Sequence, residues 1–157
     1  MTRMVSAILL IALAANGVVF ALDKKKAEYV GGTVPNLKEK SEGRLDTTDD
    51  KHLMFNTEAS PTVRIPYKAI TELEYGQKAG RRVGMAILIS PVALFSKKRK
   101  HYLSIGYRDD KGQDQAAIFE LGKDIVRATL KIIETRSGQK LVYQDDEARK
   151  SGVGGGN

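Results

Sequence analysis

The sequence predicts a mainly β domain, a curved antiparallel sheet or partly open barrel that one C-terminal α-helix closes. Between residues 27 and 121, short stretches alternate apolar and polar side chains and are separated by turn residues, a pattern typical of antiparallel strands. From residue 123 the apolar spacing changes to the period of a helix. A hydrophobic N-terminal segment precedes the domain and is expected to be a signal helix.

The strands are expected in the first three quarters of the chain. The first covers Ala27–Val34, where Gly31 and Gly32 indicate a bulge or bend. Further strands are expected over residues 43–47, 51–56, 62–67, 69–75, 101–107 and 115–121. The last two are joined by a hairpin turn in which Gly112 supplies a positive φ.

The C-terminal helix is expected over residues 123–137. Val126, Leu130 and Ile133 share one of its faces, Asp124 suits the first turn, and Gly138 suits the end. Residues 141–143 are expected to pack back as a short extended piece. The polar residues 144–157, which end in three glycines and Asn157, predict a disordered tail.

The N-terminus has the layout of a secretory signal peptide over residues 1–21. Arg3 gives a positive start, an apolar stretch follows, and Val19–Ala21 fits a cleavage site. A retained membrane anchor is the other interpretation, although the three lysines 24–26 directly after it oppose translocation. Residues 22–26 form a charged leader. Both interpretations predict export, to the periplasm or to the outer face of the cytoplasmic membrane.

The absence of cysteine excludes several kinds of chemistry. With zero Cys residues the chain has no disulfide, no thiol catalysis and no Cys-based metal site. Its stability has to come from an apolar core, and residues 27–143 are long enough for one domain.

The net charge of +7 is concentrated between Gly76 and His101, in a segment without any acid. Its cations are Lys78, Arg81, Arg82, Lys97, Lys98, Arg99 and Lys100. Without these, Lys and Arg equal the 19 Asp and Glu in number. An apolar run, Val83–Phe95, lies between the two basic clusters.

This segment has two interpretations. In the first, the segment lies on an anionic membrane surface. The surface is contacted by Arg81, Arg82, Lys97, Lys98, Arg99 and Lys100, and the side chains that insert into it are Ile87, Leu88, Leu94 and Phe95. The apolar run Val83–Phe95 is too short to cross a bilayer, which needs about 20 apolar residues. In the second, the run is a buried element of the core or of a homodimer interface, and the cations are its solvated ends.

Specific strings carry a resemblance to a known superfold. YVGGTV, IPYKAITELEYGQK, SKKRKHYLSIGY and QAAIFELGKD resemble an uncharacterised group of exported bacterial proteins with a PH-like core, and the Pro66–Tyr67 corner is similar to that of GRAM and bacterial PH domains. The resemblance implies a PH-like fold over residues 27–143 and a binding role. Members that bind phosphoinositides concentrate Lys and Arg between their first two strands. Residues 35–48 here are mixed in charge, so no such site is implied.

The remaining polar residues predict no chemistry. His52 and His101 have no partner at metal-ligand spacing, and His101 is expected to extend the basic cluster. The acidic pairs at residues 49–50, 109–110 and 145–146 are expected to belong to turns. No cofactor motif is present. No nucleic-acid site is expected, because Phe95 and Tyr102 are the only aromatic residues near the basic clusters and the export signal argues against one.

The sequence therefore predicts a non-enzymatic exported module without cofactor or metal. It would bind an anionic membrane lipid or another protein through residues 76–101. The alternative is a soluble structural or interaction domain that buries residues 83–95. Neither interpretation fixes the oligomeric state.

Overall fold

A computed structural model describes residues 26–58, 60–77 and 100–153 of the chain. The described elements, in chain order, are β1 (Ala27–Gly32), β2 (Ser41–Asp46), β3 (His52–Asn56), β4 (Val63–Pro66), the 3-10 turn η1 (Tyr67–Ala69), β5 (Ile70–Gly76), β6 (His101–Arg108), β7 (Asp114–Leu121), α2 (Val126–Ser137), β8 (Leu141–Tyr143) and α3 (Asp146–Val153). The mainly β class is confirmed, with strand limits close to those expected from the alternating pattern.

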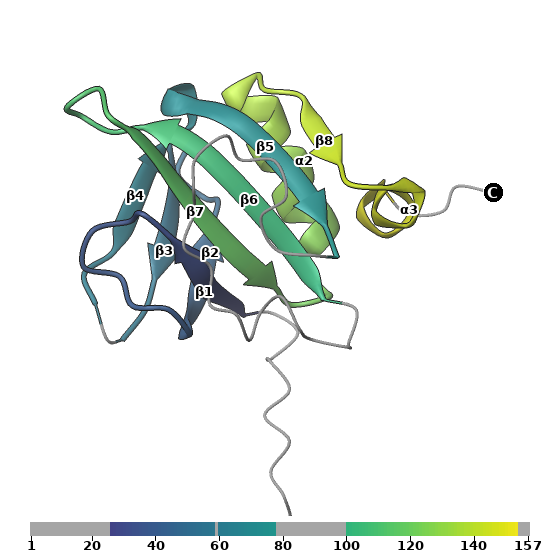
Figure 1. The fold of residues 1–157 in the computed structure, drawn as a ribbon, viewed down its shortest axis with the longest axis horizontal. Helices are drawn as coiled ribbons and strands as arrows, with labels where there is room; N and C mark the ends of the chain where they lie inside the picture. Colours follow the sequence, from purple (N-terminus) through teal and green to yellow (C-terminus); the bar gives the residue numbers. More distant parts are fainter. Residues whose placement is uncertain (1–25, 59, 78–99, 154–157) are drawn as a thin grey trace, which may run out of the picture.

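The strands form one eight-stranded sheet in the order β4-β3-β2-β1-β7-β6-β5-β8. Every neighbouring pair is antiparallel except β5 and β8, which run parallel. The sheet is therefore mixed and not closed, because β4 and β8 remain its two edges. Figure 1 shows the curvature of the sheet, with β1–β4 turned away from β5–β7 and α2 behind the latter.

The expected bulge in β1 and the expected hairpin turn after β6 are both confirmed. The register between β1 and β7 shifts between Tyr29 and Gly31, and Gly32 has a φ of 137°. Gly112 has a φ of 76°, and its N–H donates to the carbonyl of Asp109. Both positions use the freedom of glycine in a region that other residues rarely adopt.

The core lies between the concave side of the sheet and α2. The three aromatic rings Tyr29, Phe55 and Phe119 meet at its centre, with ring centroids 5.8 Å apart for Tyr29 and Phe119 and 5.0 Å apart for Phe55 and Phe119. They come from β1, β3 and β7, so this cluster joins the two halves of the curved sheet. Such edge and tilted ring pairs add to the free energy of burial.

The C-terminal helix begins three residues later than the periodicity predicts. Residues 123–125 form a turn, in which the N–H of Ile125 donates to the carbonyl of Gly122, and α2 follows from Val126. Asp124 therefore precedes the helix. The expected end is confirmed, because Gly138 is left-handed with a φ of 72° and its N–H donates to Glu134 O.

Arg136 in the last turn of α2 ties the helix to the turn between β2 and β3. Its Nη1 donates to the carbonyl oxygens of Thr47 and Asp49, and its Nη2 lies 2.8 Å from Asp50 Oδ1. The guanidinium also lies over the Tyr67 ring, 5.5 Å from its centroid. One side chain thus fixes the helix across the end of the concave face.

The disordered tail expected over residues 144–157 is wrong for most of its length. Residues 146–153 form α3, whose first turn is capped by Asp145 Oδ1, an acceptor for the N–H of Ala148 at 2.7 Å. Ala148 and Gly152 are buried, and a side chain at Gly152 would meet the rings of Tyr143 and Tyr75. These small residues let the short helix pack closely against the two tyrosines. The described part of the fold therefore has two α-helices, α2 and α3, where one was expected.

Several expectations lie outside the described residues. These are the signal segment 1–21, the charged leader up to residue 25, the apolar and basic residues 78–99, and the last four residues 154–157. In the part of the chain that the structure describes, no helix is long and apolar enough to cross a membrane.

Candidate functional site

The strand register brings two distant basic runs of the sequence to the same end of the sheet. Ala27 at the start of β1 and His101 at the start of β6 both pair with Leu121 at the end of β7. Lys26 and Lys100, which directly precede these two strands, are therefore about two strand spacings, or roughly 10 Å, apart. We call this end of the sheet, with Lys26, Lys100 and Lys123, the basic end. It lies at the bottom of the sheet in Figure 1.

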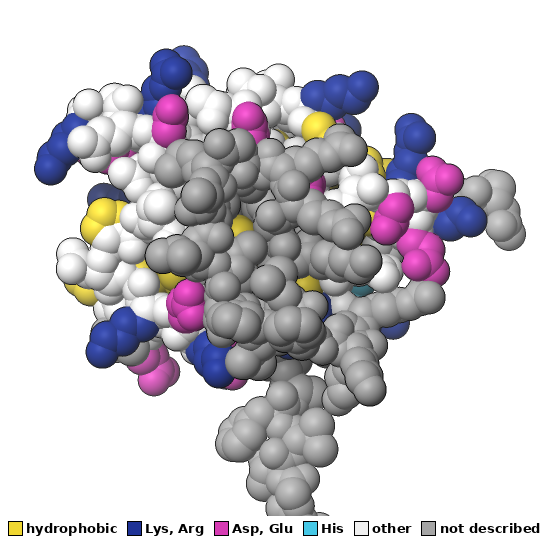
Figure 2. Space-filling view, in the orientation of Figure 1, with side chains coloured by type: hydrophobic (Ala, Val, Ile, Leu, Met, Phe, Trp, Pro, Cys, Tyr) yellow, Lys and Arg dark blue, Asp and Glu magenta, His cyan; other side chains and the backbone are white. Residues whose placement is uncertain are grey.

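The sequence supplies further cations directly beside Lys26 and Lys100. Lys24 and Lys25 precede Lys26, and residues 97–99 add Lys97, Lys98 and Arg99 before Lys100. Elsewhere, Figure 2 shows described Lys and Arg side chains interspersed with Asp and Glu around the rim of the view. The surplus of positive charge therefore belongs to runs that enter the fold at this end.

Acidic side chains already engage Lys26 and Lys100. Lys100 Nζ donates to Glu120 Oε2 at 2.6 Å, and Lys26 Nζ lies 3.7 Å from Glu42 Oε2. Burial raises the pKa of Glu28, which lies directly opposite Glu120 and is further affected by its charge. The ion pairs neutralise Lys26 and Lys100 in part, so the free positive charge has to come from the neighbouring residues of each run.

Lys100 is the one candidate membrane contact that falls within the described residues. Its side chain is about one-third exposed and reaches from the start of β6 toward Glu120. The other candidate contacts, Arg81, Arg82, Lys97, Lys98 and Arg99, and the candidate insertion residues, Ile87, Leu88, Leu94 and Phe95, lie outside them.

A broad hollow of about 740 Å³ adjoins the basic end along β2. It is lined by Lys26, Lys38, Glu39, Lys40, Ser41, Glu42, Gly43, Arg44, Asn56, Thr57 and Glu58. Four cations and three acids share this surface, so it offers both donors and acceptors to a polar ligand. No sequence pattern predicted this hollow, because its residues come from separate strands and loops.

His101 does not extend the basic cluster as expected. Its Nδ1 lies 2.6 Å from Tyr75 Oη, and the two rings stack with an interplanar angle of 9°. Tyr75 Oη also lies 3.1 Å from Ser151 Oγ, which donates to the carbonyl of Ala148. The imidazole therefore belongs to a hydrogen-bonded chain that links β6 and β5 to α3.

His101 predicts a loss of stability on acidification. Burial, with the positive charge of Lys123 as a second cause, lowers the pKa of His101 below its usual value of about 6.5. The unfolded chain therefore binds more protons between the two pKa values, and the free energy of unfolding falls as the pH drops through that window. We expect urea midpoints to fall between pH 7.5 and 5.

The control for this pH dependence is His101→Gln. This variant is less stable at pH 7.5, because it loses the Tyr75 contact, but its urea midpoint changes less with pH. Glu28 acts in the opposite direction, since its raised pKa favours the folded state as the pH falls. If His101→Gln lost as much stability on acidification as the unaltered chain, His101 would not be the group responsible.

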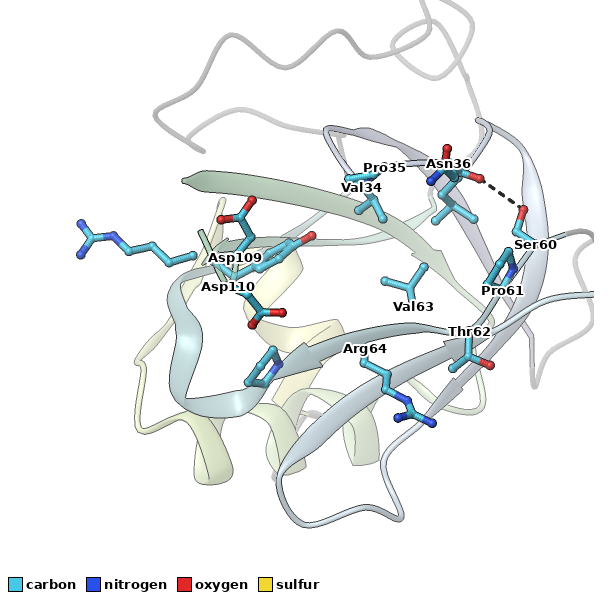
Figure 3. A pocket seen from close by; sticks show the side chains of 14 residues that line it. Val34, Pro35, Asn36, Ser60, Pro61, Thr62, Val63, Arg64, Asp109 and Asp110 are labelled. Carbon is cyan, nitrogen blue, oxygen red and sulfur yellow. Dashed lines mark hydrogen bonds between the residues drawn. The ribbon is translucent and has the colours of Figure 1, made fainter. Parts of the chain in front are cut away.

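A second hollow, of about 240 Å³, lies toward the β6–β7 hairpin. Val34, Leu37, Val63 and Tyr107 give it an apolar part, and the full lining adds Pro35, Asn36, Ser60, Pro61, Thr62, Arg64, Pro66, Arg108, Asp109 and Asp110. Figure 3 shows the three chain segments that build it and the hydrogen bond from the Ser60 hydroxyl to the Asn36 carbonyl. Charges of both signs line it, so it favours no ligand of one charge.

Two of the three acidic pairs, residues 49–50 and 109–110, are confirmed as turn residues. The third is not, because Asp145 caps α3 and Asp146 lies in its first turn. Asp49 Oδ1 accepts from the N–H groups of Lys51 and His52, and Asp109 Oδ1 from those of Lys111 and Gln113. These backbone donors lower the pKa of both carboxyl groups. Among the described residues no group of His, Asp and Glu side chains is placed to hold a metal ion.

Comparison with known proteins assigns this chain to no family. The chain matches no model of a protein family, and no curated protein matches it.

Proposed function

We propose that this chain is a non-enzymatic, exported PH-like module that binds an anionic membrane surface through its basic end. It acts in the periplasm or at the outer face of the cytoplasmic membrane. The open, mainly β sheet with a C-terminal helix on its concave side supports the PH-like assignment. The pattern of residues 1–21 supports export.

One observation carries the proposal: Ala27 of β1 and His101 of β6 both pair with Leu121 of β7. Two basic runs about 70 residues apart in sequence are joined to the two strands that flank β7, at one end of the sheet. Residues 1–25 enter the fold at this same end, since they lead directly into Lys26 and β1. Whether residues 1–21 are cleaved or retained, the end that follows them is the one nearest the membrane during export.

The charge is large enough to matter for membrane binding. A cation near an anionic lipid surface contributes on the order of 1 kcal/mol, and the contribution decays within a Debye length. Lys97, Lys98 and Arg99 together would then change the partition coefficient on the order of 100-fold. Because attraction of this kind is electrostatic, salt should weaken it.

Flotation with lipid vesicles tests the proposal. The chain from Leu22 onward is mixed with vesicles containing about one-third phosphatidylglycerol, or with phosphatidylcholine alone. We expect salt-sensitive binding to the anionic vesicles, and a fall on the order of 100-fold when Lys97, Lys98 and Arg99 are changed to Gln. The matched control changes Lys111, Lys131 and Lys140 to Gln, which removes the same charge from exposed positions elsewhere.

Two results would contradict the proposal. Equal losses in the two triple variants would show that net charge, and not the basic end, sets the affinity. Equal binding to neutral vesicles at high salt would remove the electrostatic contribution. An absence of vesicle binding would favour the alternative function, a soluble structural or protein-interaction domain.

A further inference from the structure

The central strands have a second face, opposite the core. Leu103, Ile105 and Phe119 belong to the core, so their neighbours in β6 and β7 point the other way, since side chains alternate along a strand. The register sets these neighbours side by side across the sheet. We call this surface the outer face and define it by Glu28, Val30, Glu74, Tyr102, Ser104, Ala116, Ile118 and Glu120.

The outer face is buried, although no described element covers it. Tyr102, Ser104 and Ile118 are only 2%, 2% and 0% exposed. Yet α2 lies behind the sheet in Figure 1, α3 lies beside β5 and β8, and no labelled helix or strand lies in front of β7 and β6. A solvated sheet face would carry polar side chains, whereas the middle of this one is apolar. An occupant other than the described elements is needed.

Carboxylates lie on two sides of the apolar middle of the outer face. Glu28 and Glu120 face each other across β1 and β7, and Glu74 lies on β5 beside Ser104. Glu74 Oε1 accepts from Gln144 Nε2 at 2.7 Å, but its Oε2 is buried without a hydrogen-bond partner. A matching occupant is therefore apolar in its middle and cationic on both sides.

The chain itself contains such a sequence at this place. Gly76 of β5 pairs with Tyr102 of β6, so these strands are antiparallel neighbours that a turn of two to five residues could join. Instead, residues 78–99 lie between them. They carry the apolar run Val83–Phe95, cations on both sides of it, and no acid. Both ends of these residues are joined to strands of the outer face, which gives them a high effective concentration there.

We propose that the outer face is the docking site for residues 78–99 of the same chain, with the run Val83–Phe95 against Tyr102, Ser104 and Ile118. The flanking cations then approach the carboxylates of the outer face. In this arrangement the apolar run is not available for insertion into a lipid bilayer. Membrane binding by the basic end, as proposed above, is then electrostatic alone.

Thiol reactivity tests the docking, because the chain has no cysteine and a single introduced thiol is the sole reporter. Ser104→Cys places a nearly isosteric thiol on the outer face. Ala117→Cys, on the neighbouring strand, faces the core, and Ala128→Cys is exposed on α2. In the full chain we expect Ser104→Cys to react with a thiol reagent on the order of 100-fold more slowly than Ala128→Cys, as Ala117→Cys does.

Replacing residues 78–99 by Asn-Gly should then expose only the outer face. Ser104→Cys should approach the rate of Ala128→Cys, while Ala117→Cys stays protected. If that variant fails to fold by circular dichroism, Ile87→Asp with Leu88→Asp in the full chain takes its place, with the same expected change in Ser104→Cys.

Each other outcome would overturn the docking proposal. Rapid reaction of Ser104→Cys in the full chain would show an open face. Protection that survives the change in residues 78–99 would identify another occupant. Protection that depends on protein concentration would indicate a second copy, and protection that requires vesicles would indicate lipid. None of these outcomes alters the flotation test of the basic end, so the two proposals fail separately.

Discussion

Gly32→Ala is expected to destabilise the fold by about 3 kcal/mol or more. Gly32 has a φ of 137°, a region that alanine rarely adopts, and a Cβ there would overlap the carbonyl oxygen of Ala116. That oxygen accepts the N–H of Thr33 at 2.8 Å, so any shift that relieves the overlap disturbs the bond between β1 and β7. The measurement is the free energy of unfolding from urea titration.

Gly112→Ala is the matched control, because it separates backbone strain from collision. Gly112 also has a positive φ, 76°, but no heavy atom lies within 4 Å of a Cβ built there. Its substitution should cost only the strain of a left-handed residue, about 1 kcal/mol. If both variants lost the same stability, the close approach of β1 to β7 would not be what requires glycine at position 32.

Phe119→Ala is expected to cost about 3–5 kcal/mol, because it leaves a cavity between the two halves of the sheet. The ring is fully buried between Tyr29 and Phe55. A loss of this size is comparable with the whole stability of many single domains, so the variant should unfold at a much lower urea concentration.

Phe119→Leu tests whether this position requires the aromatic ring contacts or only an apolar side chain. Leucine keeps most of the apolar volume but loses the ring contacts, so we expect a loss of roughly 1–1.5 kcal/mol. A loss below 1 kcal/mol for Phe119→Ala would mean that the aromatic cluster does not hold the halves together.

The strands were predictable because one buried face imposes a period of two on the sequence. β6, for example, begins at His101, where the alternation begins, and Gly112 marks the turn that follows. α2 was predictable for the same reason, with the period of a helix. Its first residue was not predictable, because residues 123–125 fit the helical spacing but form a turn. Patterns of this kind show which side of an element is buried, but not which other elements pack or pair with it.

The parallel pairing of β8 and the helix α3 could not be predicted from periodicity. β8 has three residues, too few for an alternation, and its partner β5 is about 70 residues earlier. α3 is polar by composition and is held by small residues against two tyrosines, which a hydropathy pattern does not register. The basic end was predictable only as separate runs, because its convergence depends on the register of β1, β7 and β6.

The position of β1 also sets the order in which this fold can form. β1 is among the first parts of the domain to be made, yet one of its two neighbours in the sheet, β7, lies about 90 residues further along the chain. Contacts so distant in sequence close slowly, because loop entropy is lost before burial repays it. A chain that cannot complete its central strand pair until most of it has been synthesised stays unfolded for longer during synthesis. The export that we propose for this chain would benefit from that delay.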